Sequence, residues 1–567
     1  MARPQWCRAW MKPSSLCLVL IIAAAAGLRF WGLGFGLPNI NCRPDETILV
    51  DHALAIGAGD FNPHFFNYPT FHFYLLTLVY GLYFCLGYAG GIFADIRAFQ
   101  HLYLQDPSSF YLIGRALSAV LGTASVGLVY AIGRHLGGER VGLLGAAFLA
   151  GAFLHVRDSH FLTVDIAATF HVLLAYCFAL RYCAVGRRAN LLLAGLFAGL
   201  AVSTKYNMAL LMPGLGLAVW FGPQQLEGKS RQIVLLGAVA TAAFILGSPY
   251  IVLDFPAFWR DFNFERLHAA QGHGIDLGRG WWHHLSFSLP LGLGWPLWAA
   301  GILGLVCLGR FYRRPGWVLL SGVLVYYGVA GSSYTVFVRY MVPIIPFLCL
   351  AAAVLVDISL KGRSIWPTVL AGGLLVAPSA YAAYQHGRLL VQPDTRLLAT
   401  HWIEEQIPSG TRLALVGDGV GYPTLARSRE WLTRQWEDRR ARGAGQWLEW
   451  ALSWGDYPPT PNYNIVELRA YNPLALRSIW TQYSTADLRR RDIRWVVVHL
   501  HPLAYSAVDT TFAIQLEQEG VIEWEIDPFK GRTKRPVYDP IDAYYTPLAG
   551  FQGVARPGPA LRIYRLP

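Results

Sequence analysis

Two adjacent carboxylates, Asp45 and Glu46, follow Arg43 and Pro44 shortly after the first apolar run of the chain. Pro44 favours an extended backbone at Arg43, and this helps to aim the side chains that follow. A carboxylate at the edge of a low-dielectric layer is suited to act as a general base toward a hydroxyl group. Alternatively, the pair opens a helix over 47–55, because Asp is a favourable N-cap residue. The two interpretations are compatible.

Three cations, Arg115, Lys205 and Arg339, are candidates for binding a phosphate group. Arg binds phosphate through a planar fork of N–H donors, and Lys binds it as a point charge. Such contacts stabilise the charge that develops as a phosphate departs. Tyr206 and Tyr250 would add hydroxyl donors. Lys205 is the most informative residue, because a Ser-Thr-Lys-Tyr-Asn break between apolar runs is tolerated where it lines a cavity.

Further polar residues lie between apolar runs, where ionisable groups often mark a substrate path. Asp165 is another carboxylate candidate for the active site. The candidate substrate-cavity residues are His64, Tyr68, His155, His160, Tyr250, Glu265 and His268. The alternative is that each of these residues anchors a helix end at the lipid headgroups.

One loop also holds several potential metal ligands, namely Glu265, His268, His273, His283 and His284. Their spacing matches no compact zinc motif such as H-E-x-x-H, so solvated or interfacial histidines are the preferred interpretation and a bound divalent ion is the alternative. The sequence therefore predicts no required cofactor.

The composition separates a membrane body from a water-soluble part. Of 567 residues, 54% are hydrophobic and only 14% are charged, against about 25% charged in soluble proteins. Residues 1–384 hold 25 Lys and Arg and 15 Asp and Glu, whereas the much shorter segment 385–567 holds 22 and 20. We therefore expect a transmembrane domain over 1–384 and a soluble domain over 385–567. The 14% aromatic content excludes a disordered chain.

Apolar runs long enough to cross a bilayer predict about eleven transmembrane helices. They lie near 14–36, 112–132, 141–157, 166–184, 190–205, 207–222, 232–249, 285–309, 316–331, 341–357 and 364–384. Basic tufts occupy every second gap between them, at Arg3/Arg8/Lys12, Arg134/Arg140, Arg187/Arg188, Lys229/Arg231, Arg310/Arg313/Arg314 and Lys361/Arg363. The positive-inside rule places these tufts and the N-terminus in the cytoplasm and the C-terminal domain outside. Basic residues in such tufts do not form the polar face of a nucleic-acid binder.

A further apolar run at 68–88 would reverse this order if it crossed the membrane. We therefore expect it to lie along the outer surface as an interfacial helix, for which its many Tyr and Phe residues are suited. Residues 37–111 then form one external loop.

The C-terminal segment is predicted to be an external α/β domain. Residues 395–407 have helical spacing, 412–416 and 494–500 have strand character, and 561–564 form a possible edge strand. The segment 426–460 is expected to be helical. No Gly-rich phosphate loop or nucleophile motif is present in it.

Several stretches of the chain together resemble a known family. They are RPDE (43–46), NYPTFHFYLL (67–76), YLIGRALSAVLG (111–122), HVRDSHFLTVD (155–165), STKYN (203–207), GSPYIVLDFPAF (247–258) and VRYMVPIIPF (338–347). In this order they resemble GT-C glycosyltransferases, specifically the protein O-mannosyltransferase and aminoarabinose-transferase branch. The resemblance covers about residues 15–384.

The resemblance implies roles for particular residues. Asp45 would deprotonate the acceptor hydroxyl, and Glu46 would help to position the acceptor. Arg115, Lys205 and Arg339 would meet the phosphate of a polyprenyl-phosphate donor, and Asp165 would lie near the active cavity. The chain departs from the aminoarabinose enzymes at 67–68, where Asn-Tyr replaces Glu-Lys.

The sequence thus predicts a multi-pass plasma (inner) membrane enzyme that transfers one sugar, preferably mannose, from a polyprenyl phosphate to a protein or glycolipid hydroxyl. Transfer is expected on the outer face, with inversion. One alternative is an oligosaccharyltransferase or ligase that uses a lipid diphosphate. The other is a lipid or sugar transporter, which would favour internal repeats and midplane charges that the sequence does not show.

Overall fold

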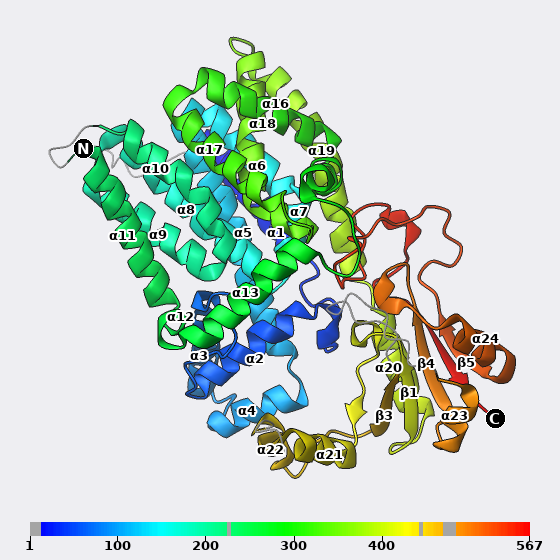
Figure 1. Ribbon diagram of the computed structural model, residues 1–567. Coiled ribbons are helices and arrows are strands. Elements are labelled where there is room, and N and C mark those ends of the chain that lie inside the picture. Colours follow the sequence, from blue (N-terminus) through cyan, green and yellow to red (C-terminus); the bar gives the residue numbers. More distant parts are fainter. Residues whose placement is uncertain (1–12, 224–227, 441–445, 469–482) are drawn as a thin grey trace, which may run out of the picture.

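The computed structural model describes residues 13–223, 228–440, 446–468 and 483–567. A bundle of apolar helices forms the larger part of the molecule, and a mixed sheet with flanking helices lies beside one end of it (Figure 1). The basic residues Arg3, Arg8 and Lys12 lie outside the described residues.

Long apolar helices coincide with most of the predicted spans. They are α1 (Pro13–Phe30), α5 (Ser108–Gly137), α6 (Glu139–Gly151), α8 (Val164–Val185), α9 (Arg188–Thr204), α10 (Met212–Phe221), α11 (Lys229–Gly247), α16 (Trp295–Phe311), α17 (Arg313–Ala330), α18 (Ile345–Ser359) and α19 (Ile365–Leu390). Within the described part, six helices are long and apolar enough to cross a bilayer by themselves, and a bent pair adds a seventh. The number of eleven spans stays a prediction.

The predicted span at 285–309 is broken. The segments α14 (Gly280–His283), η3 (His284–Ser288) and α15 (Leu289–Leu293) precede α16, and the chain bends by 119° between them and that helix. Gly294, at the bend, has a φ of +73°, which a residue with a side chain rarely adopts. Pro296 is the second residue of α16, where its missing N–H costs nothing.

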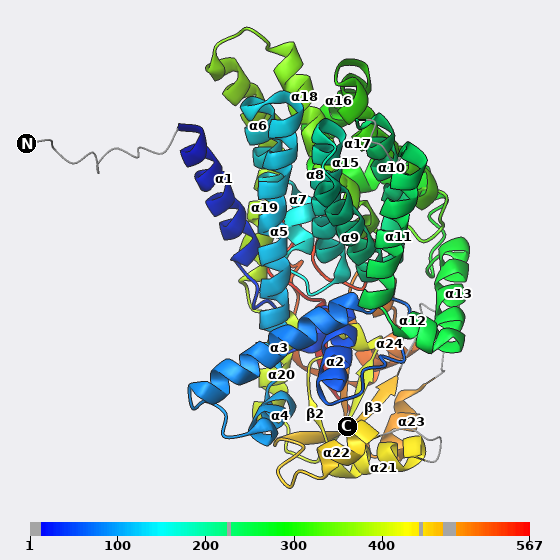
Figure 2. The same cartoon turned by 90° about the vertical axis from the view of Figure 1, so that its left-hand side faces the viewer.

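The chain between α1 and α5 forms a separate layer across one end of the bundle. It contains α2 (Asp45–Gly57), α3 (Phe71–Ala89) and α4 (Ile96–Gln105). Figure 2 shows α3 running across the lower end of the bundle, whereas α1 and α5 run along its length. Although α3 is long and apolar enough to span a bilayer, this orientation agrees with the interfacial helix predicted from the charge pattern.

The C-terminal part contains a six-stranded sheet in the order β2-β3-β1-β4-β6-β5. The strands are β1 (Arg412–Val416), β2 (Ala426–Arg427), β3 (Asn462–Leu468), β4 (Trp495–Leu500), β5 (Val521–Ile526) and β6 (Ala560–Arg565). The first four pair in parallel, and β6 joins them antiparallel. The expected edge position of 561–564 is wrong, because β6 pairs with β4 on one side and β5 on the other.

Helices cover the sheet and connect its strands. They are α20 (Thr395–Gln406), α21 (Arg429–Arg440), α22 (Gln446–Leu452), α23 (Thr485–Arg490) and α24 (Thr510–Glu519). Apolar clusters fill both faces of the sheet, one below α20 and one below α24. The α/β fold predicted for this part is therefore confirmed.

The chain returns to the helical bundle between β5 and β6. Leu548 belongs to the buried core of the bundle, and Ile541 packs against Val336 and Phe337. The ring of Tyr544 packs edge-on against the ring of Phe161, with 4.7 Å between centroids. The segment 537–549 thus joins the two parts of the molecule, and it brings two buried acidic residues to their boundary.

Candidate functional site

Asp45 lies in the first turn of α2, immediately after Pro44. Its side chain is 30% exposed, and Oδ2 is 3.2 Å from Nη1 of Arg339 and 3.4 Å from Nη2 of Arg43. The N-cap position is taken by Pro44, so Asp45 is not the capping residue that the alternative interpretation assumed. A carboxylate that is partly open and held by two guanidinium groups has a fixed orientation and can still receive a proton.

A second carboxylate, Asp542, completes this arrangement from the C-terminal segment. Its Oδ1 accepts hydrogen bonds from Arg43 at 2.6 Å and from Arg339 at 3.0 Å. Its Oδ2 accepts one from Arg157 at 3.2 Å. Burial opposes ionisation of Asp542, but the three guanidinium groups outweigh burial and hold its pKa well below the usual range. Asp542 is therefore a permanent anion at the centre of an arginine cluster.

Glu46 and Arg115 form a different, closed pair. Both side chains are fully buried, and the guanidinium donates to both carboxylate oxygens of Glu46 at 2.7–3.1 Å. Its remaining donor binds the backbone carbonyls of Leu33 and Phe35, each at 2.8 Å. Oε1 of Glu46 also accepts the backbone N–H of Leu162. The polar atoms of Arg115 and Glu46 are thus occupied by each other and by backbone groups, and the pair joins α2 and α5.

Removing one member of that pair is expected to destabilise the protein. Replacing Arg115 by Met leaves the Glu46 carboxylate buried without its partner, at a cost of about 3–5 kcal/mol. Thermal unfolding of the purified protein in detergent measures this loss. The double variant that also carries Glu46→Gln should recover part of it, and a single variant as stable as the wild type would contradict the structural role.

Lys205 lies at the break between α9 and η2 (Tyr206–Leu211), as the STKYN pattern predicts. Its Nζ is 2.5 Å from Oδ1 of Asp165, in the first turn of α8. The same nitrogen lies 4.9 Å from the centre of the Tyr340 ring. Because Tyr340 follows Arg339 in sequence, this second ion pair neighbours the arginine cluster.

Tyr68 connects the two groups of charges. Its side chain is half-buried in the loop before α3, and burial raises the pKa of the phenol well above its usual value. The charges of Asp45, Arg339 and Asp165 also act on this phenol. Tyr68 therefore lies within reach of both ion-pair groups, and Asp45, Asp165, Lys205 and Arg339 belong to one site.

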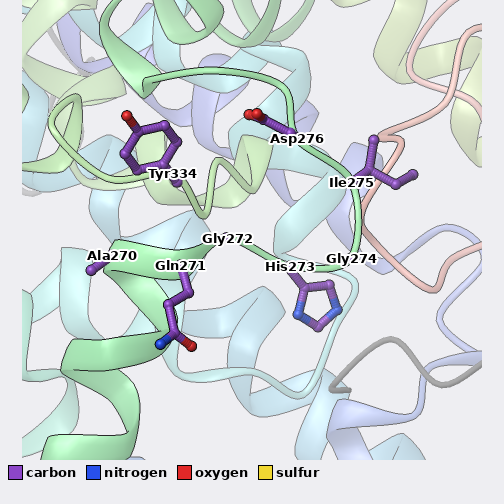
Figure 3. A pocket seen from close by; sticks show the side chains of 8 residues that line it. All are labelled: Ala270, Gln271, Gly272, His273, Gly274, Ile275, Asp276 and Tyr334. Atoms are coloured by element: carbon purple, nitrogen blue, oxygen red, sulfur yellow. The ribbon is translucent and has the colours of Figure 1, made fainter. Parts of the chain in front are cut away.

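The rim of this site comes from α13 (Phe255–Gln271) and the loop after it. Glu265 accepts a hydrogen bond from Asn67 at 2.6 Å, and His268 is hydrogen-bonded to His273 at 2.8 Å. Burial lowers the pKa of His273 to about 4, so this imidazole is neutral at neutral pH. A cavity of about 360 Å³ opens beside the loop (Figure 3). Its lining residues are Ala270, Gln271, Gly272, His273, Gly274, Ile275, Asp276 and Tyr334.

The remaining residues that the sequence singled out as site candidates make contacts of their own. Tyr206 donates to the carbonyl of Phe66, and Tyr250 begins the short α12 (Tyr250–Leu253). His64 is exposed and 3.2 Å from Asp60. His155 is fully buried and hydrogen-bonded to Arg29.

His160 is also fully buried, and it is hydrogen-bonded to the carbonyls of Val156 and Trp31. His155, within α7 (Phe153–Asp158), and His160, just after it, thus serve helix packing. Within the described ranges, no three His, Cys, Asp or Glu side chains gather as a metal site would require.

Sequence reasoning missed three members of the arginine cluster. Arg43 and Arg157 lie within the stretches RPDE and HVRDSHFLTVD, two positions from the candidates Asp45 and His155. Their place within these stretches was the available signal. Asp542 gives no such signal, because 499 residues separate it from Arg43 in the chain.

Known proteins resemble this chain in sequence and in fold. Residues 111–252 match the family model of dolichyl-phosphate-mannose-protein mannosyltransferases. ArnT from Cupriavidus metallidurans, solved with undecaprenyl phosphate bound, is 15% identical over 97% of this chain and 98% of its own, with a TM-score of 0.50. The chain has the GT-C fold. The GT-C resemblance given by the motifs is thereby confirmed, and the protein is a multi-pass membrane protein.

Another GT-C structure shares this architecture. The Archaeoglobus fulgidus oligosaccharyltransferase, solved with a tethered acceptor peptide, is 13% identical over 87% of this chain and 70% of its own, with a TM-score of 0.50. A search of curated proteins by sequence gives no match. At these identities the likeness concerns the fold, so the chemistry is argued from the site of this chain.

Proposed function

We propose that this protein is a membrane glycosyltransferase that moves one sugar from a polyprenyl monophosphate to a hydroxyl acceptor at the outer face of the membrane. The observation that carries the proposal is the partly open Asp45 carboxylate, 3.2 Å from Arg339, beside the Lys205–Asp165 pair. A base and two cations at one place are what this reaction requires. ArnT with bound undecaprenyl phosphate supports a lipid-phosphate donor for the fold.

In the proposed reaction Asp45 accepts the proton of the acceptor hydroxyl as its oxygen attacks the anomeric carbon. The bond between that carbon and the phosphate oxygen breaks, and polyprenyl phosphate leaves with the bonding electrons. Lys205 and Arg339 stabilise the charge that grows on the phosphate. A single in-line displacement of this kind inverts the anomeric configuration. Mannose is the favoured sugar, because the matched family model describes mannosyltransferases.

The decisive experiment compares donors. Purified protein in lipid vesicles is incubated with cell-envelope extract and radiolabelled polyprenyl-phosphate mannose, other polyprenyl-phosphate sugars or a lipid-diphosphate oligosaccharide. Transfer from a monophosphate donor is the expected result. Activity only with the diphosphate oligosaccharide would instead support an oligosaccharyltransferase, and the absence of transfer from every donor would contradict an enzymatic role.

A further inference from the structure

The ion pairs around Asp45 form a closed ring that includes the C-terminal domain. Asp45 contacts Arg43 and Arg339, and both arginines also contact Asp542. Arg43 is 1% exposed and Asp542 is 4% exposed, so solvent screens these contacts little. The two carboxylates therefore compete for the same two guanidinium groups.

The segment that carries Asp542 is docked by other contacts. Asp539 accepts the backbone N–H of Val338 at 2.9 Å, and Ile541 packs in an apolar cluster with Val336 and Phe337. Leu548 is buried in the core of the helical bundle. Since these contacts suffice to place the segment, the charge of Asp542 has its main effect on the arginines.

The effect of Asp542 on the two arginines follows from the number of charges in the cluster. Without Asp542, Arg43 and Arg339 would direct their donors to Asp45 alone. A carboxylate that accepts additional charged hydrogen bonds is a weaker base. The cluster would also gain one net positive charge, which strengthens its attraction for an anionic phosphate.

We infer that Asp542 is a positioning residue for sugar transfer: it draws Arg43 and Arg339 partly away from Asp45, which keeps Asp45 reactive and lets the polyprenyl phosphate product depart. This inference rests on the proposed function. It makes the C-terminal domain a contributor to the reaction site, although the base lies on α2 and the phosphate-binding cations belong to the helical bundle.

The test compares Asp542→Asn with Asp539→Asn in the full-length protein. Asp539 lies in the same segment and fixes its backbone, but it forms no ion pair with the arginine ring. For Asp542→Asn we expect kcat to fall about 100-fold, because proton transfer is impaired. Inhibition by added undecaprenyl phosphate should become about tenfold stronger, because the cluster has lost a negative charge. Asp539→Asn should keep both values within about twofold of the wild type.

Asp542→Glu keeps the charge and displaces it by one methylene group. It should therefore lower kcat while it leaves product inhibition at the wild-type level, and it serves as the test if Asp542→Asn does not fold. If Asp542 had a purely structural role, Asp542→Asn would weaken phosphate binding and lower stability together. Both Asn variants would then have the same kcat and the same product inhibition. If the wild type is active and the variants behave in that way, this inference alone is overturned. If the wild type uses no polyprenyl-phosphate donor, the proposed function itself fails.

Discussion

Replacing Asp45 by Asn is expected to lower kcat for sugar transfer by about 10³-fold, which lies within the range that general bases contribute. The amide has nearly the same size as the carboxylate but cannot accept the hydroxyl proton. Donor binding should change much less, because Lys205 and its partner Asp165 stay in place. The measurement is single-turnover transfer from a radiolabelled polyprenyl-phosphate sugar at saturating acceptor.

A matched control is available in the same helix. Asp51 also lies on α2, and its carboxylate accepts a hydrogen bond from the Tyr103 hydroxyl at 2.6 Å. Asp51→Asn should retain wild-type kcat. Undiminished transfer by the Asp45→Asn protein would reject Asp45 as the base, whereas equal losses in both variants would point to a general disturbance of α2.

The local sequence predicts the candidate site better than it predicts the contacts inside it. Asp45 follows the first apolar run after a short polar stretch and Lys205 interrupts an apolar pattern, and ionisable residues at such places are costly unless they line a polar cavity. Arg115 meets the same criterion, yet its charge is consumed by Glu46 and two carbonyl groups. Its position at a predicted helix end gave no means to distinguish a buried structural pair from a ligand-binding cation.

Contacts between distant segments explain the other differences between the sequence-based predictions and the structure. The 68–88 run is as apolar as a membrane span, and only the order of basic tufts predicted that α3 lies across the bundle. The strands β3 and β5 were missed. β5 is largely exposed on both faces, whereas burial in β3 alternates as far as Val466 and then shifts by one residue. Asp542 reaches the site through a return of the chain between β5 and β6, which no local pattern of residues indicates.

Replacing Lys205 by Gln is expected to lower kcat by about 10²-fold and to raise the KM for the donor by a smaller factor. A hydrogen-bond donor that is already oriented in a site that excludes water contributes most where charge develops, which here is on the departing phosphate. The measurement is the split between kcat and KM for the polyprenyl-phosphate donor. Lys229→Gln is the matched control, because Lys229 begins α11 and contacts the carbonyl of Trp220.

A second test of the role of Lys205 changes its ion-pair partner, Asp165. Asp165 holds the ammonium group at 2.5 Å, so Asp165→Asn should leave the cation present but less well oriented. We expect a loss of about tenfold, smaller than that of Lys205→Gln, since orientation is impaired while the charge remains. If Asp165→Asn were instead the more damaging change, Asp165 would itself take part in the proton transfer, and the assignment of Asp45 as the base would have to be revised.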